Sequence, residues 1–259
     1  MSSPSFQELT RRPGLKVGTY FGEFSGPAVG RMASAAGCDF VMVDMEHSGF
    51  TFETVKAMVR NLHDAGVASL VRPPSKARHH LARACDVGAQ GVIPPMVASA
   101  DEARDMLEVI KYAPEGRRGV ALGIAHDDYL PGPVPEKFAA ANRKTSLVPL
   151  IETADGLENV DAIAAVDGVD CLWIGHFDLS CALGVPGQFE HPDFVAAGQR
   201  VRAAAKSHGR ALGRLVSTVE EGAALYAAGF DMIIYSGDVW LLAGALSDGV
   251  QALRATCGD

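Results

Sequence analysis

Short apolar runs alternate along the chain with longer segments whose apolar residues recur at helical spacing. The clearest run extends from Phe40 to Val43 without interruption, which is typical of a strand buried on both faces of a parallel sheet. Residues 51–65 show the other pattern, and Gly66 stands where the helix would end. The chain therefore alternates predicted strands with predicted helices.

This alternation predicts eight strands, each followed by a helix. The expected strands are 15–21, 40–45, 68–72, 91–94, 146–151, 169–174, 211–216 and 231–235. The expected helices are 25–36, 51–65, 75–87, 99–112, 155–166, 192–207, 218–228 and 239–254. Residues 113–145 break the pattern with repeated Gly and Pro and a short helix at 135–142, and intervals of this length usually serve function.

Eight strands alternating with helices predict one α/β domain, a (β/α)8 TIM barrel over residues 1–259. A doubly wound open sheet is the alternative. It is disfavoured because no G-x-G-x-x-G sequence follows the first strand, where a dinucleotide-binding fold would place its phosphate loop.

The composition is that of an ordinary globular protein, with 48% hydrophobic and 21% charged residues. A net charge of -8 disfavours nucleic acid and anionic membranes as partners, because both attract basic surfaces. Residues 1–14 contain no apolar run typical of a signal peptide, and the five cysteines form no C-x-x-C pair. We therefore expect a cytoplasmic protein with reduced thiols.

Ionisable residues gather where predicted strands end. Asp44, Glu46 and His47 follow the second strand, Arg72 ends the third, and Glu152 ends the fifth. Asp178 lies in what we expect to be a long loop after the sixth strand. Since barrel enzymes bind ligands at the carboxyl ends of their strands, these side chains predict one site.

The carboxylates of Glu152 and Asp178 suit a hard divalent cation such as Mg²⁺, Mn²⁺ or Co²⁺, with water and a chelating substrate completing its coordination. The alternative is that Asp178 caps a turn and Glu152 pairs with an arginine. No lysine falls at the carboxyl end of a strand, so the residues do not favour Schiff-base chemistry. Carbonyl activation would then come from the metal.

Arg72 and His47 complete the predicted chemistry. The guanidinium of Arg72 stays charged and can neutralise an oxyanion, although a salt bridge to Asp44 or Glu46 is compatible with that role. His47 is the natural general base, and either Asp44 or Glu46 could orient its second ring nitrogen.

These motifs together resemble the HpcH/HpaI family of class II, metal-dependent pyruvate aldolases. The resemblance covers about residues 15–242. It rests on Val-Asp-Met-Glu-His (43–47), Val-Arg (71–72), Asp-Val-Gly-Ala-Gln (86–90), Pro-Glu-Gly-x-Arg-Gly-Val (114–120), Ile-Glu-Thr (151–153) and Gly-x-x-Asp-Leu-Ser (175–180).

The resemblance implies a barrel of the phosphoenolpyruvate/pyruvate type, with a role for each motif. Glu152 and Asp178 would hold the metal, Arg72 would bind the substrate oxyanion, and His47 with Asp44 would form the acid/base dyad. Asp86 would contribute to a neighbouring subunit's pocket. The resemblance also implies a homo-hexamer, a trimer of dimers, in which the C-terminal helix 239–254 packs on a partner barrel.

Two departures from the family pattern are visible. His176 and Phe177 follow Gly175 where the family usually has Pro and a small residue, and Leu150 stands where some members carry Gln. Backbone N–H groups of this segment would bind the substrate carboxylate in the family. We therefore expect altered substrate choice, with His176 as a hypothetical extra acid or base.

The predicted activity is reversible cleavage of a 4-hydroxy-2-oxo acid to pyruvate, or a close 2-oxo acid, and an aldehyde through a metal-stabilised enolate. Two alternatives stay open. One is another carbon–carbon lyase on the same enolate site, either a 2-oxo-diacid decarboxylase or an acyl-CoA lyase. The other is a non-catalytic 2-oxo-acid binding protein.

Overall fold

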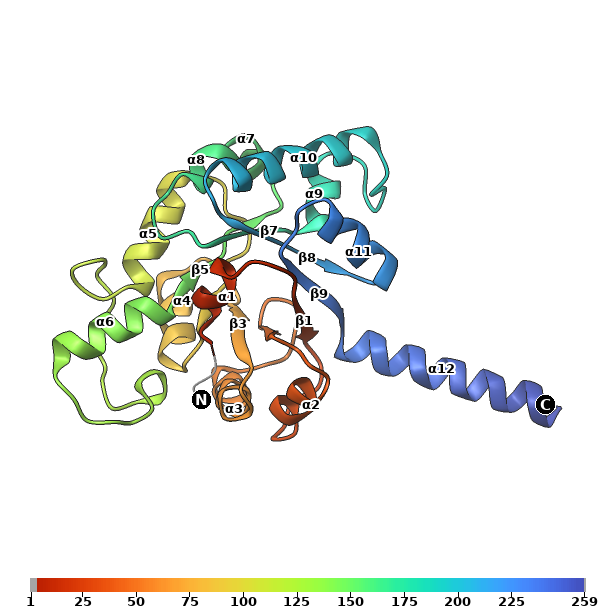
Figure 1. Cartoon of the computed structure of the whole chain (residues 1–259), viewed down its shortest axis with the longest axis horizontal. Helices are drawn as coiled ribbons and strands as arrows, with labels where there is room; N and C mark the ends of the chain where they lie inside the picture. The colour runs from red at the N-terminus through yellow and green to blue at the C-terminus, as the bar shows by residue number, and fades with distance from the viewer. Residues whose placement is uncertain (1–3, 259) are drawn as a thin grey trace.

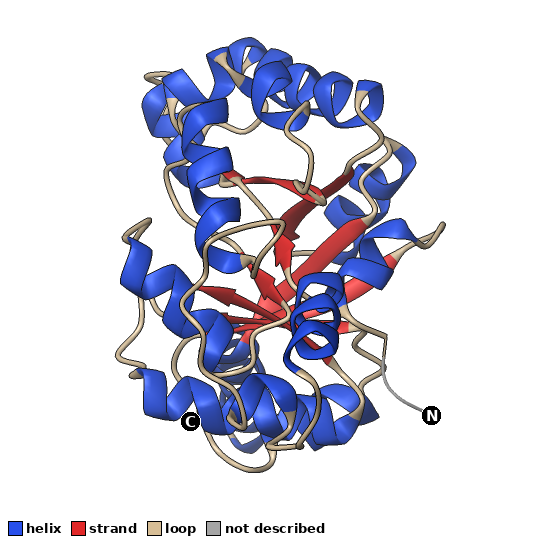
Figure 2. Cartoon of the chain, turned by 90° about the vertical axis from the view of Figure 1, so that its left-hand side faces the viewer, coloured by secondary structure: helices blue, strands red, loops and turns tan. Residues whose placement is uncertain are grey.

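A computed structural model describes residues 4–258. Its strands lie inside a ring of helices (Figure 2). All pairings are parallel, and the sheet order is β5-β4-β3-β2-β1-β9-β8-β7-β6. The strands are β1 (Lys16–Phe21), β2 (Phe40–Asp44), β3 (Ala68–Arg72), β4 (Gly91–Val92), β5 (Ser146–Leu147), β6 (Leu150–Ile151), β7 (Cys171–Ile174), β8 (Ala211–Val216) and β9 (Met232–Gly237).

The two ends of this strand order meet, so the sheet curls into a barrel. β5 and β6 belong to one extended stretch, the predicted strand 146–151, which is interrupted at Val148 and Pro149 because proline has no N–H to donate. Leu147 pairs with Val92 of β4 on one side and forms a parallel bridge to Val169 on the other. The prediction of an α/β barrel is confirmed.

The predicted helices are present, with several differences at their ends, and α1, η1 and α9 are additional to the prediction. They are α1 (Phe6–Arg11), α2 (Val29–Ala35), α3 (Phe52–Ala65), α4 (Arg78–Asp86), α5 (Ala100–Ile110), η1 (Ala125–Asp127), α6 (Val134–Lys144), α7 (Ala154–Glu158), α8 (Val160–Ala164), α9 (His176–Ala182), α10 (Pro192–Ser207), α11 (Val219–Ala227) and α12 (Asp238–Cys257). The expected helix 155–166 is thus divided into α7 and α8 at Asn159.

Local sequence explains why these helices start and stop where they do. Thr51 caps α3 by accepting the N–H of Thr54 at 3.2 Å, and Gly66 ends the helix with φ +87°. Ser75 does not begin a helix as predicted. Its hydroxyl accepts the N–H of Ala77, so α4 starts at Arg78.

Two apolar cores hold the barrel. One lies between the sheet and the surrounding helices, and the other fills the barrel interior with side chains such as Met42, Leu70 and Trp173. The unpredicted α1 contributes Phe6 to the interior, where its ring meets Phe40 edge-on at 5.5 Å. This packing closes the end of the barrel at which the strands begin and leaves the carboxyl ends for a site.

Helix α12 projects away from the barrel (Figure 1). None of its residues is buried, and it carries exposed Leu242, Leu246, Val250 and Leu253 at roughly helical spacing. Its start is tied to the barrel by Asp238, whose carboxylate accepts the N–H groups of Gly22, Glu23 and Phe24 at 2.7–3.2 Å. Among residues 4–258, no helix is long and apolar enough to cross a membrane.

Candidate active site

A cavity of about 270 Å³ lies at the carboxyl ends of the strands. The cavity is lined by His47, Arg72, Glu152 and Asp178, together with Gly175, His176 and Phe177, so the structure brings together seven of the predicted site residues. A larger cavity of about 700 Å³ is lined by residues such as Gly66, Gln90 and Thr145, which precede β3, β4 and β5. It therefore lies toward the other end of the barrel and contains none of the predicted catalytic residues.

Asp44 is fully buried at the end of β2 and binds Arg72 across the register of β2 and β3. Arg72 donates from Nε to Oδ1 at 2.6 Å and from Nη2 to Oδ2 at 2.9 Å. Burial raises the pKa of Asp44, but the hydrogen bonds and charge of Arg72 outweigh it and hold the pKa below its usual value. Asp44 is thus an ionised anchor for the guanidinium.

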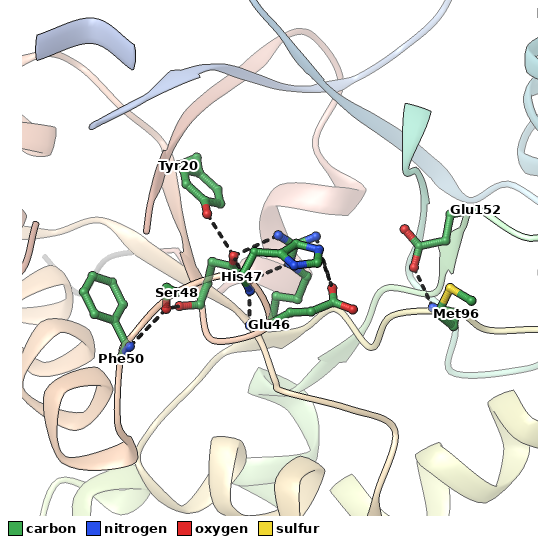
Figure 3. A network of polar contacts seen from close by, with 9 residues as sticks. Tyr20, Glu46, His47, Ser48, Phe50, Met96 and Glu152 are labelled. Carbon is green, nitrogen blue, oxygen red and sulfur yellow. Dashed lines mark hydrogen bonds and ion pairs between the residues drawn. The ribbon is translucent and has the colours of Figure 1, made fainter. Parts of the chain in front are cut away.

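Tyr20 and two backbone amides complete the coordination of Asp44. The Tyr20 hydroxyl donates to Oδ2 at 2.8 Å, and the N–H groups of Glu46 and His47 donate to the carboxylate at 3.0 and 3.1 Å (Figure 3). Burial, and then the charge of Asp44, raise the pKa of Tyr20, so the hydroxyl remains a donor. Tyr20 lines the cavity and was missed from the sequence, because it reads there as one more apolar strand residue.

The His47 ring lies against Glu46 and not against Asp44. Nε2 of His47 is 3.7 Å from Oε2 of Glu46, while only the backbone N–H of His47 reaches Asp44 (Figure 3). The expected orientation of the ring by Asp44 is therefore absent from this structure, because Arg72 and Tyr20 already occupy that carboxylate. Glu46 also lies 3.3 Å from Nη1 of Arg72.

Glu152 lines the same cavity as His47, and its side chain lies apart from those of His47 and Glu46 (Figure 3). Its Oε1 accepts the N–H of Met96 at 2.7 Å. Burial raises the pKa of Glu152 to about 7, and the charges of Glu46 and Asp178 add to the rise. Gly175 leaves room for this carboxylate, since a Cβ there would stand 2.4 Å from Oε2.

Asp178 lies in the first turn of α9, a helix where the sequence predicted a loop. Gly175 precedes this helix and donates its N–H to Ile151 at 3.2 Å. His176 and Phe177 line the cavity beside Asp178. Burial, and then the charge of Arg214, lower the pKa of His176 to about 3, which keeps the ring neutral near pH 7 and argues against a role as proton donor.

Asp86 does not line the cavity. Its Oδ1 accepts from Nη2 of the buried Arg118 at 2.6 Å, and Arg118 also lies over the ring of Tyr112. The contribution of Asp86 to a neighbouring pocket stays a prediction. Within the described residues, no lysine lines the cavity, so none is placed there to form a Schiff base with a substrate.

The chain matches the model of the HpcH/HpaI aldolase/citrate lyase family over residues 19–244. It belongs to this family. The chain is 32% identical over 228 residues to a 5-keto-4-deoxy-D-glucarate aldolase of Klebsiella pneumoniae, a match that covers 85% of this chain and 88% of that protein. Family membership makes the chain an enzyme of the lyase class.

Solved structures agree with this assignment. An HpcH/HpaI aldolase from Desulfitobacterium hafniense superimposes with a TM-score of 0.88 at 33% identity, covering 93% of each chain. A family protein from Burkholderia cenocepacia gives a TM-score of 0.88 at 29% identity, covering 96% of this chain and 98% of the other. The solved structures of this family therefore share the barrel fold of this chain.

Proposed function

We propose that the protein is a divalent-metal-dependent aldolase that cleaves a 4-hydroxy-2-oxo acid to pyruvate, or a close 2-oxo acid, and an aldehyde. One observation carries the proposal: a paired guanidinium, an imidazole and two carboxylates line a single cavity at the carboxyl ends of the strands. The aldolases among its relatives support the same reaction type.

The residues fit a hard divalent cation. Glu152 is buried beside the charges of Glu46 and Asp178, and burial first, then these charges, raise its pKa; a cation would offset both effects. Among residues 4–258, no three His, Cys, Asp or Glu side chains form a metal-binding group. Two carboxylates with water and a chelating substrate match what Mg²⁺ and Mn²⁺ accept.

Glu152 and Asp178 would hold this cation, which would act as a Lewis acid on the keto oxygen of the 2-oxo acid. Arg72 stabilises negative charge that develops on that oxygen, and Asp44 fixes the guanidinium in place. His47 removes a proton from C3, directly or through water. The C3 carbanion equivalent then attacks the aldehyde carbon, and the new alkoxide takes up a proton; cleavage is the reverse.

Exchange of the pyruvate methyl protons in deuterated water, followed by NMR, tests this proposal. We expect exchange with Mg²⁺, Mn²⁺ or Co²⁺ that stops when EDTA is added. No exchange with any of the three metals would exclude the enolate mechanism. Exchange without aldol cleavage over a panel of aldehydes would favour a different carbon–carbon lyase.

The proposal extends to assembly as a homo-oligomer. The apolar side chains of α12 have no cover within the described chain, and a helix that projects from its own barrel can reach a second copy (Figure 1). We propose that α12 packs on a partner barrel, as in the hexamer that the family resemblance implies.

A further inference from the structure

Two aromatic side chains at the rim of the cavity are exposed. Phe177 exposes 61% of its surface and Trp240 exposes 53%, and both line the cavity that holds Arg72 and Asp178. Exposed aromatic side chains beside a binding cavity commonly contact the ligand, because large apolar surface is unfavourable in water. Neither residue has a part in the proton transfer or charge stabilisation described above.

Phe177 is held in place from behind. Its ring meets Phe189 edge-on at 5.1 Å and lies 4.7 Å from the ring of His176. Phe189 in turn packs under the guanidinium of the buried Arg214 at 5.5 Å. These contacts support one side of the Phe177 ring.

Trp240 is held by Tyr20. Their rings stack with centroids 5.2 Å apart and an interplanar angle of 25°. Gly237 makes this stack possible, because a Cβ there would stand 2.6 Å from Tyr20 and 2.9 Å from Trp240. Trp240 thus stands at the start of α12 with one face against Tyr20, and it lines the cavity.

The cavity is lined by both ionisable and apolar side chains. The ionisable groups are those already assigned to the 2-oxo acid and the cation, while Met42, Ile93, Leu150, Trp173 and Leu215 supply an apolar lining. A substrate held by Arg72 and the carboxylates can therefore also contact apolar side chains of this lining.

We infer that Phe177 and Trp240 form an aromatic rim that selects an aldehyde with an apolar ring or chain over a small hydroxylated aldehyde. This inference rests on the proposed aldolase function, because it names the substrate class of the same site. Stacking or edge contact with two fixed rings favours an aromatic or aliphatic acceptor, whereas a hydroxylated one would lose hydrogen bonds to water there.

Kinetics with two aldehydes test the rim. Aldol addition of pyruvate to benzaldehyde and to glycolaldehyde is measured with the metal-loaded wild type, Phe177→Ala and Tyr129→Ala. We expect the wild type to prefer benzaldehyde in kcat/KM. Phe177→Ala should reduce that preference about five- to tenfold, the scale of one aromatic contact. Tyr129 is 54% exposed and lies outside the cavity, so Tyr129→Ala should keep the wild-type preference.

An equal loss for both aldehydes in Phe177→Ala, or an unchanged preference, would overturn the inference. A measurement without turnover separates this failure from failure of the proposed function. In saturation-transfer NMR, benzyl alcohol should show a clear transfer signal with the wild type. With Phe177→Ala, most of that signal should be absent. Equal transfer in the two proteins rejects the rim even where pyruvate exchange shows that the enolate chemistry is intact.

Discussion

Arg72 binds both oxygens of Asp44, with Nε 2.6 Å from Oδ1 and Nη2 2.9 Å from Oδ2. The pair lies at the ends of two neighbouring strands, since Asp44 and Arg72 are in register between β2 and β3. A guanidinium that donates from both Nε and Nη2 to one carboxylate has little freedom to turn away from the cavity. The same contact makes the pair part of the fold as well as part of the site.

Arg72→Ala should abolish turnover and also destabilise the protein. We expect a loss of about 10²–10³-fold or more in kcat, as for removal of an oxyanion donor. Because Asp44 is fully buried, loss of its partner should cost about 3–5 kcal/mol of unfolding free energy. Urea unfolding and steady-state kinetics measure the two effects.

A double variant separates stability from catalysis at this pair. Asp44→Asn with Arg72→Ala leaves no unpaired charge, so it should unfold at a higher urea concentration than Arg72→Ala alone while staying equally inactive. Tyr20→Phe is the matched control, because it removes one hydrogen bond to Asp44 and keeps the ion pair. A double variant less stable than Arg72→Ala would contradict this account.

Glu46, and not Asp44, should be the carboxylate that supports His47. Nε2 of His47 is 3.7 Å from Glu46, and the pair is partly exposed to solvent. We expect His47→Ala to reduce pyruvate proton exchange about 10²–10⁴-fold and Glu46→Gln to reduce it more modestly, about tenfold, without a change in melting temperature. Asp44→Asn should instead lower the melting temperature. A Glu46→Gln enzyme with wild-type exchange would show that Glu46 does not support His47.

The general arrangement of the site could be predicted from the sequence, because parallel strands place their carboxyl ends at one rim. Asp44, Arg72 and Glu152 follow apolar runs directly, so their position depends only on strand assignment. Tyr20 and Trp240 could not be found in this way. They come from near the two ends of the chain, and only the pairing of β1 with β9 brings their rings together.

The sequence pattern could not predict the orientation of His47 or the presence of helix α9, for a different reason. His47 can turn toward either neighbouring carboxylate, and the choice depends on Arg72 and Tyr20 occupying Asp44. Helix α9 begins at His176 without a side-chain cap and follows a glycine, so its sequence lacks the usual start of a helix. In both cases tertiary contacts decide the local structure.

Helix α12 should be required for assembly. Leu246→Glu combined with Leu253→Glu places charges on its exposed apolar side chains, and we expect the oligomer to dissociate in light scattering. Ser247→Glu is the control, since it adds a charge at a polar position of the same helix. If the wild type is a monomer, or the double glutamate variant keeps the oligomer, α12 does not pack on a second copy.

Glu152 should make the stability of the metal-free protein depend on pH. Its pKa rises from 4.5 to about 7 on folding, so the folded state holds a proton that the unfolded state has released between these values. In EDTA, the unfolding free energy should therefore fall as the pH rises from about 4.5 to about 7 and then level off with respect to this group. Denaturant titrations of wild type and Glu152→Gln over this range isolate the effect, because glutamine cannot titrate.

Mg²⁺ should stabilise the wild type more at pH 8 than at pH 6, since binding needs the ionised carboxylate of Glu152. It should have little effect on Glu152→Gln. Identical pH profiles for the two proteins in EDTA would show that Glu152 stays ionised, and equal stabilisation of both by Mg²⁺ would remove it from the metal site.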